Sequence, residues 1–338
     1  MTKLGERFKN KPMIYYAASI VASWAGVGSL MNFSTLANKS GGWAAIIWGI
    51  FNSLACIIFG VVIDYVPTMR KVMKSKVMFY LIAGLTVFQT WTQMSGIQEI
   101  FGETPLGSNF GMILAYIVSI AFVVMLLVRG MIRNVLTDTG SWILVYLLLG
   151  FLTVASIINT RGDFNNISMA VEMPVIKSGI LNGLLLVAGP FTNPYYYEIY
   201  DYNDVNEDGT RHIKNIKTSF VLAGVMFGAY MVFAGLIAWT KFNPSLSILK
   251  AILISIIAIS SLSTYLYAEY IAFGKKGGFV VNLLTVAGWY FLIPLGVMGI
   301  WKLMSQIRWV FILGALIVAL FIKYRDKKSV KEVDQNAG

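Results

Sequence analysis

Four hydroxyl-bearing residues lie within five positions of a segment that is otherwise apolar enough to cross a bilayer. The segment, AISSLSTYLYAEY, contains the hydroxyls of Ser260, Ser261, Ser263 and Thr264. In lipid, Ser and Thr hydroxyls can donate hydrogen bonds to their own helix, and they then need no further role. They can also offer neutral oxygen ligands to a hard cation such as Na⁺. The second interpretation predicts an ion site inside the membrane.

Two other apolar segments are interrupted by small residues and prolines. IVASWAGVGSLMNF, residues 20–33, carries glycines at its centre, and LLLVAGPFTNPYYYEIY, residues 184–200, carries Pro190 and Pro194. Each proline lacks a backbone N–H and obstructs the preceding turn, so the second segment is expected to break. The pair Ala25-Gly26 recurs as Ala188-Gly189. Transporters built from inverted repeats place such broken helices at corresponding positions, where solute and ions bind.

The composition shows what must hold these segments. The chain has 338 residues, of which 57% are hydrophobic and only 13% charged, and its mean hydropathy is +0.70. Soluble domains have about 25% charged residues. We therefore expect an all-α integral membrane protein. Lipid offers no hydrogen-bond partners to the backbone, so only helices or closed barrels cross it, and long unbroken apolar runs indicate helices. No signal peptide is evident, so the first apolar segment is expected to remain as the first span.

Catalytic and metal-binding motifs are scarce. Cys56 is the only cysteine and His212 the only histidine, which argues against disulfides, Cys-rich metal sites and a histidine relay. The sequence contains no HExxH or GxSxG motif and no paired aspartates within the spans. We therefore do not expect an enzyme.

Ten spans are predicted from the apolar runs, five in each half of one transmembrane domain, 1–338. They cover 13–37, 42–66, 77–98, 110–130, 141–158, 174–200, 218–240, 245–273, 279–300 and 307–323. The halves are 13–158 and 174–323, followed by a cytoplasmic tail, 324–338. The longer connections, 159–173 and 201–217, have room for short surface helices.

The positive charges predict the orientation. With a cytoplasmic N-terminus, the cytoplasmic side receives all but seven of the 27 Lys and Arg residues. The exceptions are Lys39, Arg161, Lys177, Lys241, Lys302 and Arg308 outside, and Lys250 just inside a span. Positively charged loops stay in the cytoplasm, so both termini are expected on the cytoplasmic side. The membrane is expected to be the cell membrane. This bias explains the net charge of +11 without a nucleic-acid partner.

Several motifs, in order, resemble the solute:sodium symporter family. Residues 22–41, ASWAGVGSLMNFSTLANKSG, resemble its first core helix, and ISSLSTYLYAEY resembles its eighth. Between them, residues 96–150 resemble the family's middle region, where MIRNVLTDTGSW carries Thr137 and Asp138 at the place of the family's Thr-Asp motif. The similarity extends over roughly residues 15–275 and fits a divergent member reduced to ten helices, or another branch of the same fold superfamily.

The resemblance implies the leucine-transporter fold, a 5+5 inverted repeat with helices 1 and 6 broken, and alternating access driven by Na⁺. It also implies a sodium site made by carbonyls of Ala22, Ala25 and Ser260 with the hydroxyls of Ser263 and Thr264. A register three residues earlier, centred on Ile257 and using Ser260 and Ser261 as the hydroxyl pair, stays open. Asp138 matches an aspartate on the cytoplasmic side of the sodium route, and capping of a helix start is the alternative.

The expected solute is small and neutral or zwitterionic, like an amino acid. The central parts of the spans carry almost no ionisable residues, and Lys177, Lys250 and Glu269 are placed near helix ends, where they can snorkel. A solute carboxylate would face the half-helix near Gly28 and Ser29, with Trp24, Phe191 and Tyr195 as apolar walls. Strongly anionic solutes are disfavoured. The residues expected to line this site are Trp24, Gly26, Gly28, Ser29, Gly189, Phe191, Thr192 and Asn193.

The functional expectation is therefore Na⁺-coupled symport of a small solute, with Na⁺ as the bound ion and the bilayer as the surroundings. The alternative is a sensor or scaffold subunit that keeps the transporter fold without transporting. In that case the polar loop 201–217 is the place where a partner would dock. The oligomeric state, monomer or homo-oligomer, stays open.

Overall fold

The computed structural model describes residues 12–66, 69, 71–72, 75–126, 131–159, 168–202, 213–239 and 244–336. Within these ranges every regular element is a helix, and no strand occurs. The predictions for the N-terminal Lys and Arg residues, for His212 and for most of the 201–217 loop lie outside the described residues.

The order of the helices along the chain follows the apolar runs. The α-helices are α2 (Pro12–Trp24), α3 (Val27–Ser40), α4 (Gly42–Tyr65), α6 (Lys76–Gly102), α7 (Gly107–Leu126), α8 (Met131–Asn159), α9 (Met173–Val187), α10 (Pro194–Tyr202), α11 (Ile213–Trp239), α12 (Ser247–Ala272), α13 (Gly274–Gly288) and α14 (Gly296–Asn336). Three 3₁₀ turns join some of them: η1 (Pro190–Thr192), η2 (Pro244–Leu246) and η3 (Trp289–Leu295).

The described helices identify a multi-pass membrane protein. Seven of them are long and apolar enough to cross a bilayer, or eight if the bent pair α2–α3 forms one span. A helix needs about 20 apolar residues to cross about 30 Å of hydrocarbon. Their outward faces carry many exposed large apolar side chains, as expected where lipid replaces water.

The chain bends sharply between α2 and α3. The helix axes differ by 58° across the two residues between Trp24 and Val27. Gly26 is extended there, with φ −81° and ψ 174°, and the first N–H of α3, on Val27, donates to Gln93 Oε1 of α6 at 3.0 Å. A side chain at Gly26 would overlap that amide. Glycine is therefore required for the close approach of α6 to the bend.

A second irregular stretch separates α9 from α10. Helix α9 ends at Val187, the 3₁₀ turn η1 follows, and α10 begins at Pro194. Pro190 and Pro194 have no N–H to continue a helical ladder, so the local sequence accounts for this geometry. Side chains of the turn pair with its backbone: Thr192 Oγ1 donates to the Gly189 carbonyl at 2.6 Å, and the N–H of Tyr195 donates to Asn193 Oδ1 at 3.1 Å.

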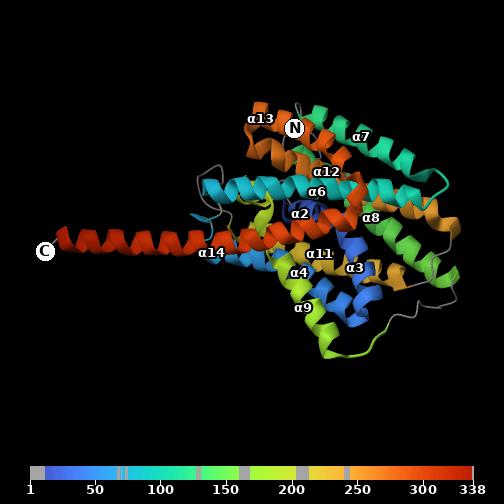
Figure 1. The fold of residues 1–338 in the computed structure, drawn as a ribbon, viewed down its shortest axis with the longest axis horizontal. Helices are drawn as coiled ribbons and strands as arrows, with labels where there is room; N and C mark the ends of the chain where they lie inside the picture. Colours follow the sequence, from blue (N-terminus) through green and yellow to red (C-terminus); the bar gives the residue numbers. More distant parts are fainter. Residues whose placement is uncertain are drawn as a thin grey trace.

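The two irregular stretches touch each other. A Cβ atom at Gly189 would overlap the indole ring of Trp24, the last residue of α2. Around this contact, α12 packs against α2, α6 and α8, while α4 packs against α9 and α11 (Figure 1). Residues far apart in the sequence therefore converge on the end of α2.

The last two predicted spans had the wrong boundaries. The sequence interpretation placed spans at 279–300 and 307–323 with a connection between them, but the chain leaves α-helix at 289–295 and is continuous in α14 from Gly296. Pro294 cannot donate to a helix, and Gly296 has a φ of +61°. Residues 301–306, WKLMSQ, contain no helix breaker. Helix α14 continues through the predicted tail to Asn336 and projects beyond the other helices (Figure 1).

Candidate functional site

A buried carboxylate on α8 is the centre of a polar cluster between four helices. Asp138 Oδ2 accepts a hydrogen bond from Ser19 Oγ of α2 at 2.6 Å. From α12, Ser260 Oγ donates to Oδ1 at 3.3 Å. Thr264 Oγ1 lies 3.5 Å from Oδ2 and 3.2 Å from the Ser260 carbonyl of its own helix, and its one hydrogen is shared between these two acceptors. Ser19 Oγ also lies 2.6 Å from the hydroxyl of Tyr195 on α10. All five side chains are buried, so these oxygens are shielded from bulk water.

The helix-capping alternative for Asp138 is wrong. Helix α8 begins at Met131, so Asp138 lies two turns inside it, where the N–H groups are used by the helix itself. The carboxylate turns instead toward α2 and α12. The Thr-Asp pair looked like a helix start because short polar residues are common at N-caps, and the apolar run that follows hides the earlier turns.

The carbonyl end of α2 is covered by hydroxyls from other helices. Ser261 Oγ of α12 donates to the Ala22 carbonyl at 2.6 Å, and Tyr265 Oη donates to the Ser23 carbonyl at 2.5 Å. The Ile20 carbonyl accepts from Tyr196 Oη of α10 at 3.1 Å. A helix C-terminus leaves its last four carbonyls without helical partners, and here hydroxyl groups satisfy those of Ala22 and Ser23.

Each residue predicted to bind sodium can now be located. Ser260 and Thr264 face Asp138, whereas Ala22 meets Ser261, a member of the alternative register. The hydroxyl of Ser263 donates to the Ser260 carbonyl of its own helix at 2.7 Å. Ala25 is buried just after α2, where its N–H donates to the Val21 carbonyl at 2.7 Å.

Ser19, Tyr195, Tyr196 and Tyr265 belong to the same polar region, and the sequence analysis did not assign them to the ion site. Their types gave little signal, because tyrosines in membrane helices are common at interfaces. A usable signal was the position of Tyr195 and Tyr196 directly after Pro194, at the start of a half-helix.

A small cavity of about 20 Å³ lies beside the bend between α2 and α3. Its lining includes Trp24, Gly26, Gly28 and Ser29, which are half of the residues predicted for the solute site. The polar side chains of Asn52, Gln89, Thr92, Gln93, Tyr265 and Arg308 complete much of the lining. This volume is room for about one water molecule, so the cavity is too small for a solute in this conformation.

The other half of the predicted solute residues shape the second irregular stretch. Gly189 packs against Trp24, and the ring of Phe191 lies 5.0 Å from that of Phe59, edge to face. Thr192 and Asn193 make the hydrogen bonds within the turn described above. Tyr195, predicted as an apolar wall, directs its hydroxyl to Ser19.

A larger cavity of about 240 Å³ adjoins the first and is lined by α3, α9 and α14, with Trp48 of α4. The two linings share Leu186, Trp301 and Arg308. The larger cavity reaches Lys39 and Ser40 at the C-terminal end of α3. Leu186, Trp301 and Arg308 therefore separate a narrow inner space from a wider outer one.

Two charged residues were misplaced by the sequence interpretation. Glu269, expected to snorkel, is 0% exposed and accepts hydrogen bonds from Thr90 Oγ1 at 2.8 Å and Thr285 Oγ1 at 2.9 Å. Arg308, expected outside the membrane, is 2% exposed. Glu269 lies inside α12, whose bounds are close to those of the predicted span, and Arg308 lies inside the continuous α14. In both cases packing with other helices buries the side chain.

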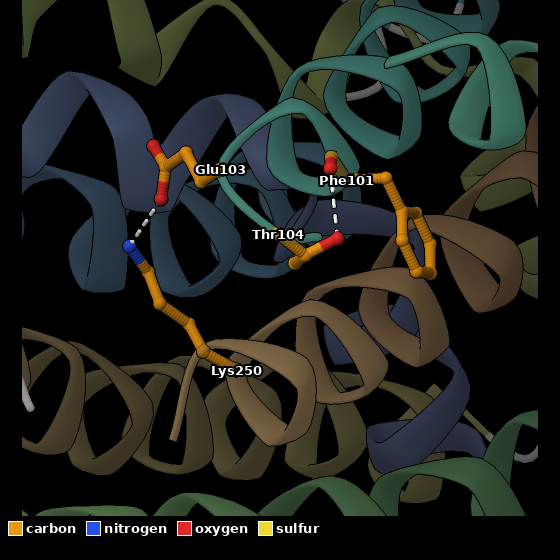
Figure 2. A network of polar contacts seen from close by, with 4 residues as sticks. All are labelled: Phe101, Glu103, Thr104 and Lys250. Atoms are coloured by element: carbon orange, nitrogen blue, oxygen red, sulfur yellow. Dashed lines mark hydrogen bonds and ion pairs between the residues drawn. The ribbon is translucent and has the colours of Figure 1, made fainter. Parts of the chain in front are cut away.

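Lys250, in contrast, lies near a helix end as expected. Its Nζ is 2.8 Å from Glu103 Oε2, just beyond the end of α6, and both side chains are partly exposed. Figure 2 shows this ion pair beside Thr104, whose hydroxyl donates to the Phe101 carbonyl at 2.8 Å. Such a half-exposed pair ties the start of α12 to the end of α6, and it contributes about 1 kcal/mol or less.

No protein-family model matches the chain, and no curated protein matches it. The resemblance to solute:sodium symporters therefore stays a prediction. A function has to be argued from the buried oxygen cluster, the two cavities and the bend that joins them.

Proposed function

We propose that this protein is a secondary active transporter that couples the movement of Na⁺ to that of a small solute by alternating access. In this proposal α2–α3 and α9–η1–α10 are the broken first and sixth helices of a 5+5 inverted repeat of the leucine-transporter type. The chain is then a divergent member of the solute:sodium symporter family. Contact between Gly189 and Trp24 supports this pairing of the two irregular stretches.

The oxygen cluster around Asp138 carries the proposal. A carboxylate buried between membrane helices is costly and is a marker of function. Its neighbours in the cluster are neutral hydroxyls from α2, α10 and α12, and the Ala22 carbonyl lies close by on α2. Hard oxygen ligands with a single negative charge match a monovalent hard cation. Na⁺ is therefore the co-transported ion that these residues fit best.

The two cavities support alternating access. The inner cavity beside Gly28 and Ser29 is small, and the larger outer cavity is lined by residues from Lys39 to Trp301. Movement of α14 against α3 would widen one cavity and narrow the other. Polar side chains such as Asn52, Gln89 and Gln93 offer hydrogen bonds to a small polar solute.

The positive-inside bias supports a location in the cell membrane with both termini in the cytoplasm. In that orientation the outer cavity faces the cell exterior. A non-transporting sensor or scaffold with the same fold is the competing function. It requires no coupling between an ion site and a solute site.

The test is direct binding of radioactive sodium to the purified protein, with potassium as competitor. We expect Thr264→Ala to weaken the apparent sodium affinity roughly 10- to 150-fold. The substitution removes one oxygen ligand of Na⁺, whose contribution is taken as that of a hydrogen bond to a charged group, about 1.5–3 kcal/mol. Asp138→Asn should abolish binding. Ser255→Ala is the matched control, since Ser255 lies on the same helix and its hydroxyl has no hydrogen-bond partner among the described residues.

Coupling is tested with the same variants. Linkage is reciprocal, so solute affinity at subsaturating sodium should fall in Thr264→Ala and recover when sodium is raised. Identical sodium binding by the parent, Thr264→Ala and Ser255→Ala, or equal competition by potassium, would reject the symporter. The sensor or scaffold function would then be preferred.

A further inference from the structure

Arg308 is a buried cation without a counter-charge. Its side chain is 2% exposed, and Nε and Nη1 have no hydrogen-bond partner among the described residues. No carboxylate of the described residues forms an ion pair with the Arg308 guanidinium. An unpaired charge removed from water is strongly unfavourable, so a residue of this kind indicates a ligand that completes it.

The guanidinium faces the two cavities from α14. Trp301, Met304 and Arg308 recur at helical spacing and line the inner cavity, while Trp301, Ser305 and Arg308 line the outer one. Arg308 Cζ lies 5.1 Å from the centre of the Trp301 ring, a cation–π contact. This contact holds the guanidinium in position on one side and leaves donors for a ligand at the wall between the cavities.

The charges of the linings select an anion. Arg308 and Lys39 are the cationic residues of the two linings, and neither lining contains Asp or Glu. The inner cavity also includes Gly28 and Ser29 in the first turn of α3, where the helix dipole favours negative charge. The charged side chains of both linings therefore have the same sign.

We propose that Arg308 binds the carboxylate of a small singly charged organic acid, the solute carried by the proposed transporter. This inference rests on the proposed function and names its substrate class, replacing the neutral or zwitterionic solute expected from the sequence. A planar guanidinium matches a carboxylate. Arg308 is the buried cation at the cavity wall and balances one negative charge, whereas Lys39 is exposed at the end of α3. The absence of acidic residues in both linings leaves no partner for a solute ammonium group. The outer cavity, about 240 Å³, is far larger than a halide ion requires.

The experiment titrates the purified full-length protein with propionate, lactate and acetate as sodium salts, at constant sodium in a sulfate background. Trp301 lies against the guanidinium, so intrinsic tryptophan fluorescence is the readout, supported by the thermal unfolding midpoint. Propionamide is the uncharged isostere, and sodium chloride is a separate arm. We expect saturable binding of at least one carboxylate and none of propionamide or chloride.

The variants are Arg308→Gln, Arg308→Lys and the matched control Lys302→Gln, which removes an exposed charge from the same helix. We expect Arg308→Gln to weaken carboxylate binding at least about 10-fold, Arg308→Lys to weaken it less, and Lys302→Gln to leave it unchanged. Without ligand, Arg308→Gln should unfold at or above the temperature of the parent, because it removes an uncompensated charge. If Arg308→Gln does not fold, the proposal is wrong, since a structural role would then explain the arginine.

Other outcomes separate this inference from the proposed function. Carboxylate binding that needs Arg308 but is equal in sodium and potassium keeps the inference and removes sodium coupling. Sodium-dependent carboxylate binding that Arg308→Gln leaves unchanged keeps the transporter and overturns the inference. Binding of chloride alone, or no saturable response to any carboxylate, also overturns it.

Discussion

At the scale of single residues, the bend after α2 depends on one amide. Gln93 Oε1 accepts the N–H of Val27, which is the first residue of α3 and is buried. Without this contact the N–H would have neither a helical partner nor water. Gln93 therefore acts as an N-cap supplied by a different helix.

We predict that Gln93→Ala lowers the free energy of unfolding by about 1–2 kcal/mol, the cost of losing a helix cap or leaving a buried N–H unpaired. Gln306→Ala, on an exposed position of α14, should change it by no more than about 0.5 kcal/mol. The measurement is reversible unfolding in a denaturing detergent, or the thermal midpoint. Equal effects of the two substitutions would show that Gln93 does not support the bend.

At the scale of elements, the approach of α9–η1–α10 to α2 requires a glycine. Gly189 lies so close to the Trp24 ring that any side chain would overlap it. In contrast, a methyl group at Gly84, on an exposed face of α6, would meet nothing within 4 Å. Substitution of the two glycines therefore compares a position in a contact between two elements, Gly189, with an exposed helix position that contacts nothing, Gly84.

We predict that Gly189→Ala lowers the free energy of unfolding by about 1–3 kcal/mol through overpacking. Gly84→Ala should leave it unchanged or raise it by up to about 1 kcal/mol through helix propensity. A double-mutant cycle with Trp24→Leu should show that the two changes are coupled, because removing the ring makes room for the methyl group. If the two substitutions change the free energy of unfolding additively, the destabilisation by Gly189→Ala does not come from overlap with the Trp24 ring.

At the scale of the whole molecule, the orientation in the membrane can be tested with cysteines, because Cys56 is the only native one and is buried. Lys177 and Lys276 are exposed and are expected on opposite sides of the bilayer. We predict that Lys177→Cys reacts with a membrane-impermeant maleimide on intact cells, whereas Lys276→Cys reacts only after permeabilisation. The parent protein gives the background. The reverse pattern would place both termini outside.

Several features of the fold follow from local chemistry and were readable in the sequence. The apolar composition requires helices, since lipid offers no partner to backbone groups. Pro190 and Pro194 account for the irregular stretch after α9. A proline has no N–H to donate to a helix, and this effect does not depend on the tertiary structure. Glycines at 26 and 28 marked the other bend. Apolar length alone, however, placed a connection at 301–306 that the continuous α14 does not have.

The side-chain partners were decided by the tertiary structure. Whether Ser261 or Ser263 faces α2 depends on how α12 is rotated about its own axis. Successive side chains of a helix point about 100° apart around that axis, so a small rotation exchanges the residue that faces α2. Asp138 meets Ser19 across 119 residues of sequence, a contact that no local pattern encodes. Composition determined that the protein lies in the membrane. Only the packing of distant helices decided which of its few charged residues, Glu269 and Arg308 among them, lie in the interior, because burial is a property of the neighbours and not of the residue.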